Sequence, residues 1–159
     1  LLNHAKKLVH LCIKNFNLNE KSLIYEVACN DGYLLQYFKK NKIPCIGIEP
    51  TSNTANLAKK VKKLKIVNEF FDSKLSIKCK KKYGAADLII SANVLAHVPN
   101  IKDFIKGHNQ LIKDDGIIIF EFHYLVNLIK QVQFDQVYHE HYFYLSLFFL
   151  HSDSSLKYL

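Results

Sequence analysis

The sequence contains no arginine, methionine or tryptophan among its 159 residues. All 22 basic residues are therefore lysines, and with 14 acidic residues they give a formal net charge of +8. Arginine makes the bidentate contacts to bases and phosphates that lysine cannot make. We therefore interpret the lysine clusters at 59–65 and 78–82 as solvated surface, with a polyanion contact as the alternative, and expect no nucleic-acid partner.

Long apolar runs, a signal peptide and closely spaced cysteines are also missing. No run approaches the roughly 18 residues of a membrane span, so we expect no membrane association and a cytoplasmic location. Cys12, Cys29, Cys45 and Cys79 form none of the close pairs typical of zinc sites, which predicts free thiols, three of them in the core. Because the chain begins at Leu1 and contains no methionine, we interpret it as part of a longer protein.

The apolar pattern predicts alternating strands and helices. The predicted strands are continuously apolar, as strands buried on both faces must be, so the fold class is α/β: a mostly parallel sheet with helices on both faces. Asn3 and Asn100 are expected to cap the first and last helices, 73–83 is expected to be a lysine-rich connection, and 114–116 a turn. Strands are predicted at 23–28, 43–49, 64–71, 86–92 and 117–122, and helices at 5–16, 33–40, 52–63 and 101–113.

Ligands of such sheets bind outside the carboxyl ends of the strands. The turn after the first strand, 26–32, keeps only Gly32 of the glycine-rich dinucleotide signature, so a pyrophosphate and an NAD-linked oxidoreductase are disfavoured, and an ordinary turn remains the alternative. Glu49 ends the second strand, where a carboxylate accepts hydrogen bonds from a ribose diol. Together these two features favour a nucleoside-type cofactor without phosphates.

Histidines mark two further positions. His97 follows the fourth strand and is either a core histidine or a functional one. Downstream, Tyr138, His139, Glu140 and His141 form the densest polar cluster, which is interpreted as an acid–base site, with a structural cluster or a metal site as alternatives. The spacing does not match the zinc motif H-E-x-x-H, and no third ligand is evident, so no metal is expected.

Five segments together resemble one enzyme family, the S-adenosylmethionine-dependent sugar C-methyltransferases. They are EVACNDGYLLQYF, GIEP, ANVLAHVPNIKDF, GIIIFEF and, most specifically, QFDQVYHEHYFYLSL. The resemblance covers roughly residues 22–148. It implies a Rossmann-like methyltransferase domain at 22–150, preceded by a helix and lead-in at 1–21 and followed by a tail at 151–159. It also implies that the sheet lacks its last two strands and that a flanking family domain is missing at each end.

The resemblance implies a cofactor site for S-adenosyl-L-methionine. Its methionine part would lie at the turn after the first strand, its ribose at Glu49, and its adenine near Phe70 and Phe71, with Asn93 close to the cofactor. The residues assigned to cofactor binding are Glu26, Ala28, Asn30, Asp31, Gly32, Glu49, Pro50, Phe71 and Asn93.

The implied reaction is methylation of the carbon alpha to the keto group of a nucleotide-linked 4-keto deoxysugar. By resemblance His141 abstracts the proton, and Tyr138 and Glu140 support it. Tyr138 or His97 would stabilise the enolate oxygen. The alternative is a methyltransferase-like fragment that binds the cofactor without catalysis. A nucleic-acid methyltransferase is disfavoured, because Asn93 begins the sequence Asn-Val-Leu-Ala and not the usual Asn-Pro-Pro-aromatic motif.

Overall fold

Five parallel strands form one sheet in the computed structural model, which describes residues 2–137 and 139–146. The strand order is β3-β2-β1-β4-β5, and every neighbouring pair is parallel. The predicted parallel α/β arrangement is therefore confirmed. The strands are β1 (Ile24–Val27), β2 (Cys45–Ile48), β3 (Lys65–Val67), β4 (Ala86–Ala92) and β5 (Ile112–Glu121).

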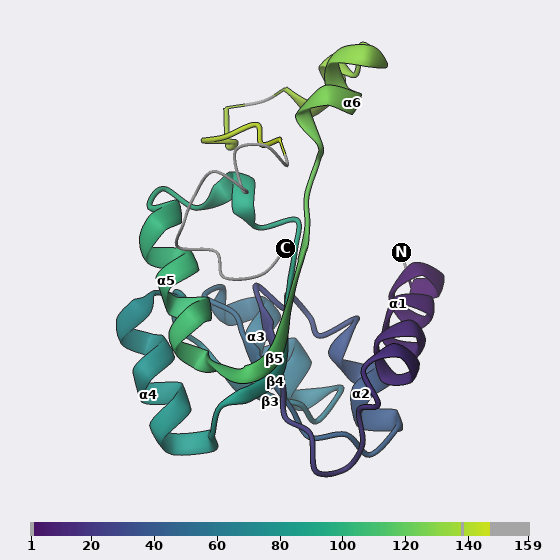
Figure 1. Ribbon diagram of the computed structural model, residues 1–159, viewed down its shortest axis with the longest axis vertical. Coiled ribbons are helices and arrows are strands. Elements are labelled where there is room, and N and C mark those ends of the chain that lie inside the picture. The colour runs from purple at the N-terminus through teal and green to yellow at the C-terminus, as the bar shows by residue number, and fades with distance from the viewer. Residues whose placement is uncertain (1, 138, 147–159) are drawn as a thin grey trace.

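Helices cover both faces of this sheet, with α1 and α2 on one side and α4 and α5 on the other (Figure 1). Each face has its own buried cluster, since side chains alternate along a strand. Ile24 and Leu88 belong to the cluster under α1, α2 and α3, whereas Tyr25 and Ile89 belong to the one under α4 and α5. The helices are α1 (Leu2–Asn15), α2 (Leu35–Lys40), α3 (Ser52–Lys60), α4 (Ser73–Tyr83), α5 (Ile101–Leu111) and α6 (Leu125–Lys130).

The segment 73–83, expected only as a lysine-rich connection, is helix α4, which was not among the predicted helices. Its lysines lie largely exposed, while Leu75 and Cys79, one turn apart, are buried against the sheet. Asp72 caps the helix by accepting a hydrogen bond from the backbone N–H of Leu75 at 2.6 Å. One buried face and a side-chain N-cap thus stabilise this helix, although most of its residues are polar.

Two smaller expectations also need correction. Asn3 does not cap α1, since the helix already includes Leu2. Residues 114–116 lie inside β5, which begins at Ile112, paired with Ala86, and passes through an irregularity in the β4–β5 register. Asn100 does cap α5, accepting a hydrogen bond from the backbone N–H of Asp103 at 3.1 Å.

Beyond β5 the chain continues to α6, which stands apart from the helices that cover the sheet (Figure 1). The segment returns through a parallel bridge between Tyr124 and Leu145, reinforced by a hydrogen bond from the N–H of Leu125 to the carbonyl of Leu145 at 2.9 Å. This bridge holds residues around 141 near the end of β5. Within 2–137 and 139–146, no helix is long and apolar enough to cross a membrane.

All four cysteines are free thiols. Cys12, Cys29 and Cys79 are buried, as expected for three core thiols, and Cys45 is half-buried. Burial raises the pKa of the Cys12 thiol to about 11, so this thiol is protonated at neutral pH.

His108 is a fully buried histidine of α5 with both ring nitrogens hydrogen-bonded. Nδ1 lies 2.8 Å from the carbonyl oxygen of Phe104, which can only accept, so Nδ1 carries the proton. Nε2 then accepts from the Ser91 hydroxyl at 2.8 Å. Burial lowers the pKa of His108 from 6.5 to about 4, against a smaller raising effect of the Phe104 hydrogen bond. His108 is therefore a neutral core residue.

This neutral form predicts a loss of stability in acid. Below pH 6.5 the imidazole of residue 108 is protonated in the unfolded chain, whereas in the folded chain His108 becomes protonated only near pH 4. The free energy of unfolding of the wild type, minus that of His108→Gln, should therefore fall by about 3 kcal/mol between pH 7 and pH 4. Urea unfolding at several pH values measures this difference.

The comparison with the variant is needed because burial also raises the pKa of Glu26 well above its usual range. A raised carboxyl pKa makes stability fall as the pH rises, which is the opposite sign, and it acts in both proteins. A difference between wild type and His108→Gln that stays constant from pH 7 to pH 4 would contradict the buried neutral imidazole.

Candidate functional site

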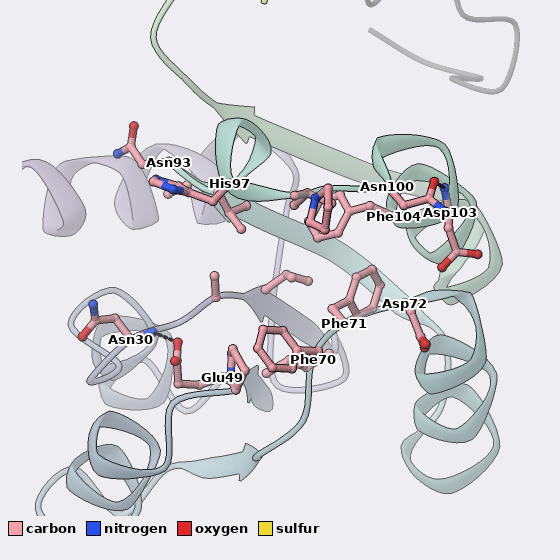
Figure 2. A pocket seen from close by; sticks show the side chains of 18 of the residues that line it. Asn30, Glu49, Phe70, Phe71, Asp72, Asn93, His97, Asn100, Asp103 and Phe104 are labelled. Carbon is pink, nitrogen blue, oxygen red and sulfur yellow. Dashed lines mark hydrogen bonds between the residues drawn. The ribbon is translucent and has the colours of Figure 1, made fainter. Parts of the chain in front are cut away.

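A cavity of about 740 Å³ opens at the carboxyl ends of β1, β2 and β4. Its position is the one expected for a ligand of a parallel sheet, and its volume is within the usual range of small-molecule sites. In Figure 2, Asn30 and Glu49 lie on one side of it and Asn93 and His97 on the other. Six residues assigned to cofactor binding from the sequence line it: Ala28, Asn30, Glu49, Pro50, Phe71 and Asn93.

The carboxylate of Glu49 is held by the backbone on both of its oxygens. Oε2 accepts from the N–H of Asn30 at 2.9 Å, and Oε1 accepts from the N–H of Thr51 at 2.8 Å. The first bond joins the end of β2 to the turn after β1 (Figure 2). Each oxygen keeps a further acceptor position, so the group is fixed in place and can still accept from the two hydroxyls of a diol.

The turn after β1 contains three residues in the left-handed region of φ, which makes the backbone turn sharply at the edge of the cavity. Ala28 (φ 58°), Asn30 (φ 52°) and Gly32 (φ 75°) all have positive φ. Such strain at non-glycine residues costs on the order of 1–3 kcal/mol each and concentrates at functional sites. Ala28 and Asn30 line the cavity, whereas Gly32 lies behind the turn, where a Cβ would overlap Leu64.

Glu26 and Asp31 also lie outside the cavity lining. Glu26 is buried under the turn, only 1% exposed, and its Oε2 has no hydrogen-bond partner. Burial raises the pKa of this carboxyl, a backbone hydrogen bond from Leu35 lowers it, and the net direction is up. Asp31 pairs with Lys62 at 2.7 Å. Neither acid points into the cavity in this conformation.

Aromatic rings form another wall. Phe71 lines the cavity, but its ring packs edge-on against Phe104, with centroids 5.4 Å apart, and against His108, at 4.8 Å. Phe70 beside it is 82% exposed and also lines the cavity (Figure 2). Phe71 is therefore half-buried and fixed by its packing against the core, whereas Phe70 is largely exposed at the cavity.

Asn93 and His97 come from the segment that follows β4. Asn93 has a positive φ of 53°, and its N–H donates to the carbonyl of Glu121 at 2.7 Å. His97 belongs to the short 3-10 helix η1 (Leu95–His97). Both line the cavity, so His97 is placed at the site and not in the core.

The histidine motif lies next to this segment. The rings of His97 and His141 stand 4.7 Å apart, centroid to centroid, at 68°. Glu140 contributes its carbonyl oxygen, which lies 3.2 Å from Nδ1 of His97, and the N–H of Tyr142 donates to the carbonyl of Ala96 at 2.7 Å. Residues 139 and 140 form a turn and not a strand. These contacts bring together two histidines that are 44 residues apart in sequence.

His141 itself lines a small neighbouring pocket and not the large cavity. His123, two residues after β5, also lines that pocket, and its ring centroid lies 6.1 Å from that of His141. Tyr138 lies outside the described residues. Among the residues that the structure does describe, no group of three or more histidines, cysteines or acids could hold a metal ion.

Several cavity residues were missed from the sequence. Tyr33 lies in the first turn, and Asp72, Asn100 and Asp103 lie where α4 and α5 begin. The pKa of Asp103 is lowered, chiefly because its carboxylate accepts hydrogen bonds from the hydroxyl and N–H of Ser73. A polar N-cap residue that follows a strand of a parallel sheet lies near the ligand edge, so Asp72 and Asn100 could have been assigned to the cavity from the sequence. Asn100 was predicted only as a helix cap.

The charge of the cavity is opposite to that of the chain. Glu49, Asp72 and Asp103 line it, and the described lining residues include no lysine, although the chain has 22. Carboxylates attract a cation and repel phosphates. The lining therefore fits a cationic ligand with a ribose better than a dinucleotide.

Comparison with known families gives the class of the protein. The chain matches the family model described as "Methyltransferase domain" over residues 4–153. The chain belongs to this family. Membership confirms the predicted class, a Rossmann-like methyltransferase domain with S-adenosylmethionine as its cofactor.

Among curated proteins, the chain is similar to the C-methyltransferase NovU of Streptomyces niveus, with 31% identity over 147 residues. The match includes 92% of this chain and 35% of that protein, so the chain spans about a third of its relative.

Solved structures show the same fold. A SAM-dependent methyltransferase from Archaeoglobus fulgidus matches with a TM-score of 0.70 at 14% identity, over 92% of this chain and 65% of that one. The YcgJ protein of Bacillus subtilis matches with a TM-score of 0.66 at 15% identity, over 94% and 65%.

The packing of Gly32 leads to a prediction about the turn. Gly32→Ala should lower the free energy of unfolding by about 1–3 kcal/mol, because of the positive φ and the overlap with Leu64. In a Leu64→Ala background the same substitution should cost less, since the overlapping side chain is gone. Urea unfolding of the four proteins measures both costs. Equal costs in the two backgrounds would show that the overlap with Leu64 does not matter.

Proposed function

We propose that this chain is the cofactor-binding domain of a C-methyltransferase that methylates the carbon alpha to the keto group of a nucleotide-linked deoxysugar. The observation that carries the proposal is the contact between His97, which lines the large cavity, and His141, in the motif that resembles that of the sugar C-methyltransferases. The name of the relative NovU, a C-methyltransferase, supports the same reaction type. A cytoplasmic location stays part of the proposal.

In this proposal the cavity holds S-adenosylmethionine, which supplies an electrophilic methyl group on a sulfonium. Glu49, fixed by Asn30 and Thr51, accepts from the ribose hydroxyls. The exposed ring of Phe70 contacts the adenine, and Asn93 and the turn after β1 surround the methionine part. The acidic lining favours the positive charge of the sulfonium.

His141 is proposed as the general base that removes the proton alpha to the ketone. Carbon acids of this kind need a base positioned at the proton and a donor at the enolate oxygen. The ring contact with His97 places His141 beside the cavity wall. The enolate carbon would then attack the methyl carbon of the sulfonium. The new carbon–carbon bond would form as the methyl carbon–sulfur bond breaks, S-adenosylhomocysteine would leave with that electron pair, and the abstracted proton would stay on the imidazole of His141.

The contact with Glu140 refines the proposed role of His97. A carbonyl oxygen only accepts, so the 3.2 Å contact with Nδ1 of His97 is a hydrogen bond when Nδ1 carries the proton. In the neutral ring Nε2 is then an acceptor. His97 can therefore donate to an enolate oxygen only as an imidazolium, and Tyr138 remains the other proposed donor.

A second candidate is cofactor binding without catalysis by this chain alone. It is favoured by the position of His141, which lines the neighbouring pocket and not the cofactor cavity. The two candidates agree on the cofactor and differ only in methyl transfer to a keto sugar.

The cofactor assignment predicts the behaviour of Glu49→Ala. Calorimetric titration with S-adenosylmethionine should show binding to the wild type and a roughly 10- to 100-fold loss of affinity in the variant, because hydrogen bonds to a charged group are lost. Glu20→Ala, which removes an exposed acid outside the cavity, is the matched control and should bind as the wild type does. Undiminished binding in Glu49→Ala would refute the ribose contact.

The base assignment predicts a separation of binding from turnover in the full-length protein. His141→Ala should lower kcat by about 10²–10⁴ and leave the cofactor affinity unchanged. His139→Ala, an exposed histidine of the same motif, is the control and should retain turnover. A methyl-transfer assay on a nucleotide-linked keto sugar measures both, and normal turnover in His141→Ala would exclude His141 as the base.

A further inference from the structure

We propose that Glu121, the last residue of β5, is a positioning residue of the cofactor site that holds Asn93 on the cavity wall and is itself oriented by His4 of α1. The inference rests on the proposed use of the cavity for the cofactor. Glu121 does not line the cavity, so it acts through Asn93.

Asn93 makes two hydrogen bonds to this one residue. Its N–H donates to the carbonyl oxygen of Glu121 at 2.7 Å, and its side-chain Nδ2 donates to Oε1 of Glu121 at 3.2 Å. Asn93 also has a φ of 53°, a left-handed conformation that costs a non-glycine residue on the order of 1 kcal/mol. Such a conformation persists only where its surroundings hold it, and Glu121 supplies contacts to both the backbone and the side chain.

The second oxygen of the carboxylate is occupied from another direction. Nε2 of His4 lies 3.0 Å from Oε2 of Glu121, although the two residues are 117 positions apart. Helix α1 is otherwise fixed by Ala5, Val9 and Cys12, which are buried in the cluster on its face of the sheet. The carboxylate of Glu121, which is 38% exposed, thus contacts both α1 and the segment after β4, and His4 favours the orientation in which Oε1 meets Asn93.

The negative charge of Glu121 also affects Tyr33, which lies in the turn after β1. The phenol of Tyr33, which lines the cavity, has its pKa raised to about 12 by burial first and then by the negative charges of Glu26, Glu121 and Asp31. The effect of Glu121 on Tyr33 is secondary to burial, whereas its contact with Asn93 is a direct hydrogen bond.

The test is a calorimetric double-mutant cycle with S-adenosylmethionine on this chain. Glu121→Ala removes the side-chain acceptor and should weaken binding about tenfold, the effect of one lost hydrogen bond to a charged group. Glu121→Gln keeps an acceptor for Nδ2 of Asn93 and should bind within about threefold of the wild type. In an Asn93→Ala background, Glu121→Ala should change the affinity by less than about twofold, because the group through which it acts is gone.

A shorter acidic side chain distinguishes the effect of the negative charge from the effect of the position of the carboxylate. Glu121→Asp keeps the charge but withdraws the carboxylate, so it should also lose about tenfold, and it serves if Glu121→Ala does not fold. Affinity equal to the wild type in Glu121→Asp or Glu121→Ala overturns the inference, as does a tenfold loss that persists in the Asn93→Ala background. If the wild type itself does not bind S-adenosylmethionine, the cofactor assignment fails instead, so the two failures are distinguishable.

Discussion

The hydrogen bond from the N–H of Asn30 to Oε2 of Glu49 is the contact on which the rest of the site depends. It joins the ends of β1 and β2, which parallel pairing has already brought to the same edge of the sheet. This hydrogen bond fixes the position of the turn after β1 relative to the carboxylate that follows β2. The cavity lies where these two strand ends meet the segment after β4, the strand that pairs with the other side of β1.

Charge is distributed so that the cavity differs from the surface around it. A chain with a formal charge of +8 has a cavity lined by three carboxylates, while the lysines of α4 lie largely exposed on its outer face. This contrast separates two interpretations of the composition. The net positive charge belongs to the exposed lysines, whereas the carboxylates that line the site favour a cation.

The strands and the main strand-end residues could be predicted from sequence, because buried parallel strands are continuously apolar. The bounds of β4 agree with the prediction, and Glu49 and Asn93 follow strands as expected. Helix α4 could not be found by composition, since only one narrow face is apolar. Residues 114–116 lie within β5 because Ile112 and Ile117, on either side of them, pair with β4, a long-range contact that the local sequence does not encode. For the same reason Glu121, which contacts His4 and Asn93, looked like an ordinary strand residue.

The central claim is that the cavity binds the cofactor with its ribose at Glu49. A crystal structure of this chain with S-adenosylhomocysteine tests it most directly. The account predicts both ribose hydroxyls within hydrogen-bond distance of the Glu49 carboxylate, with the adenine against Phe70 and the methionine part beside Asn93. A cofactor bound elsewhere, or a ribose directed away from Glu49, would contradict it.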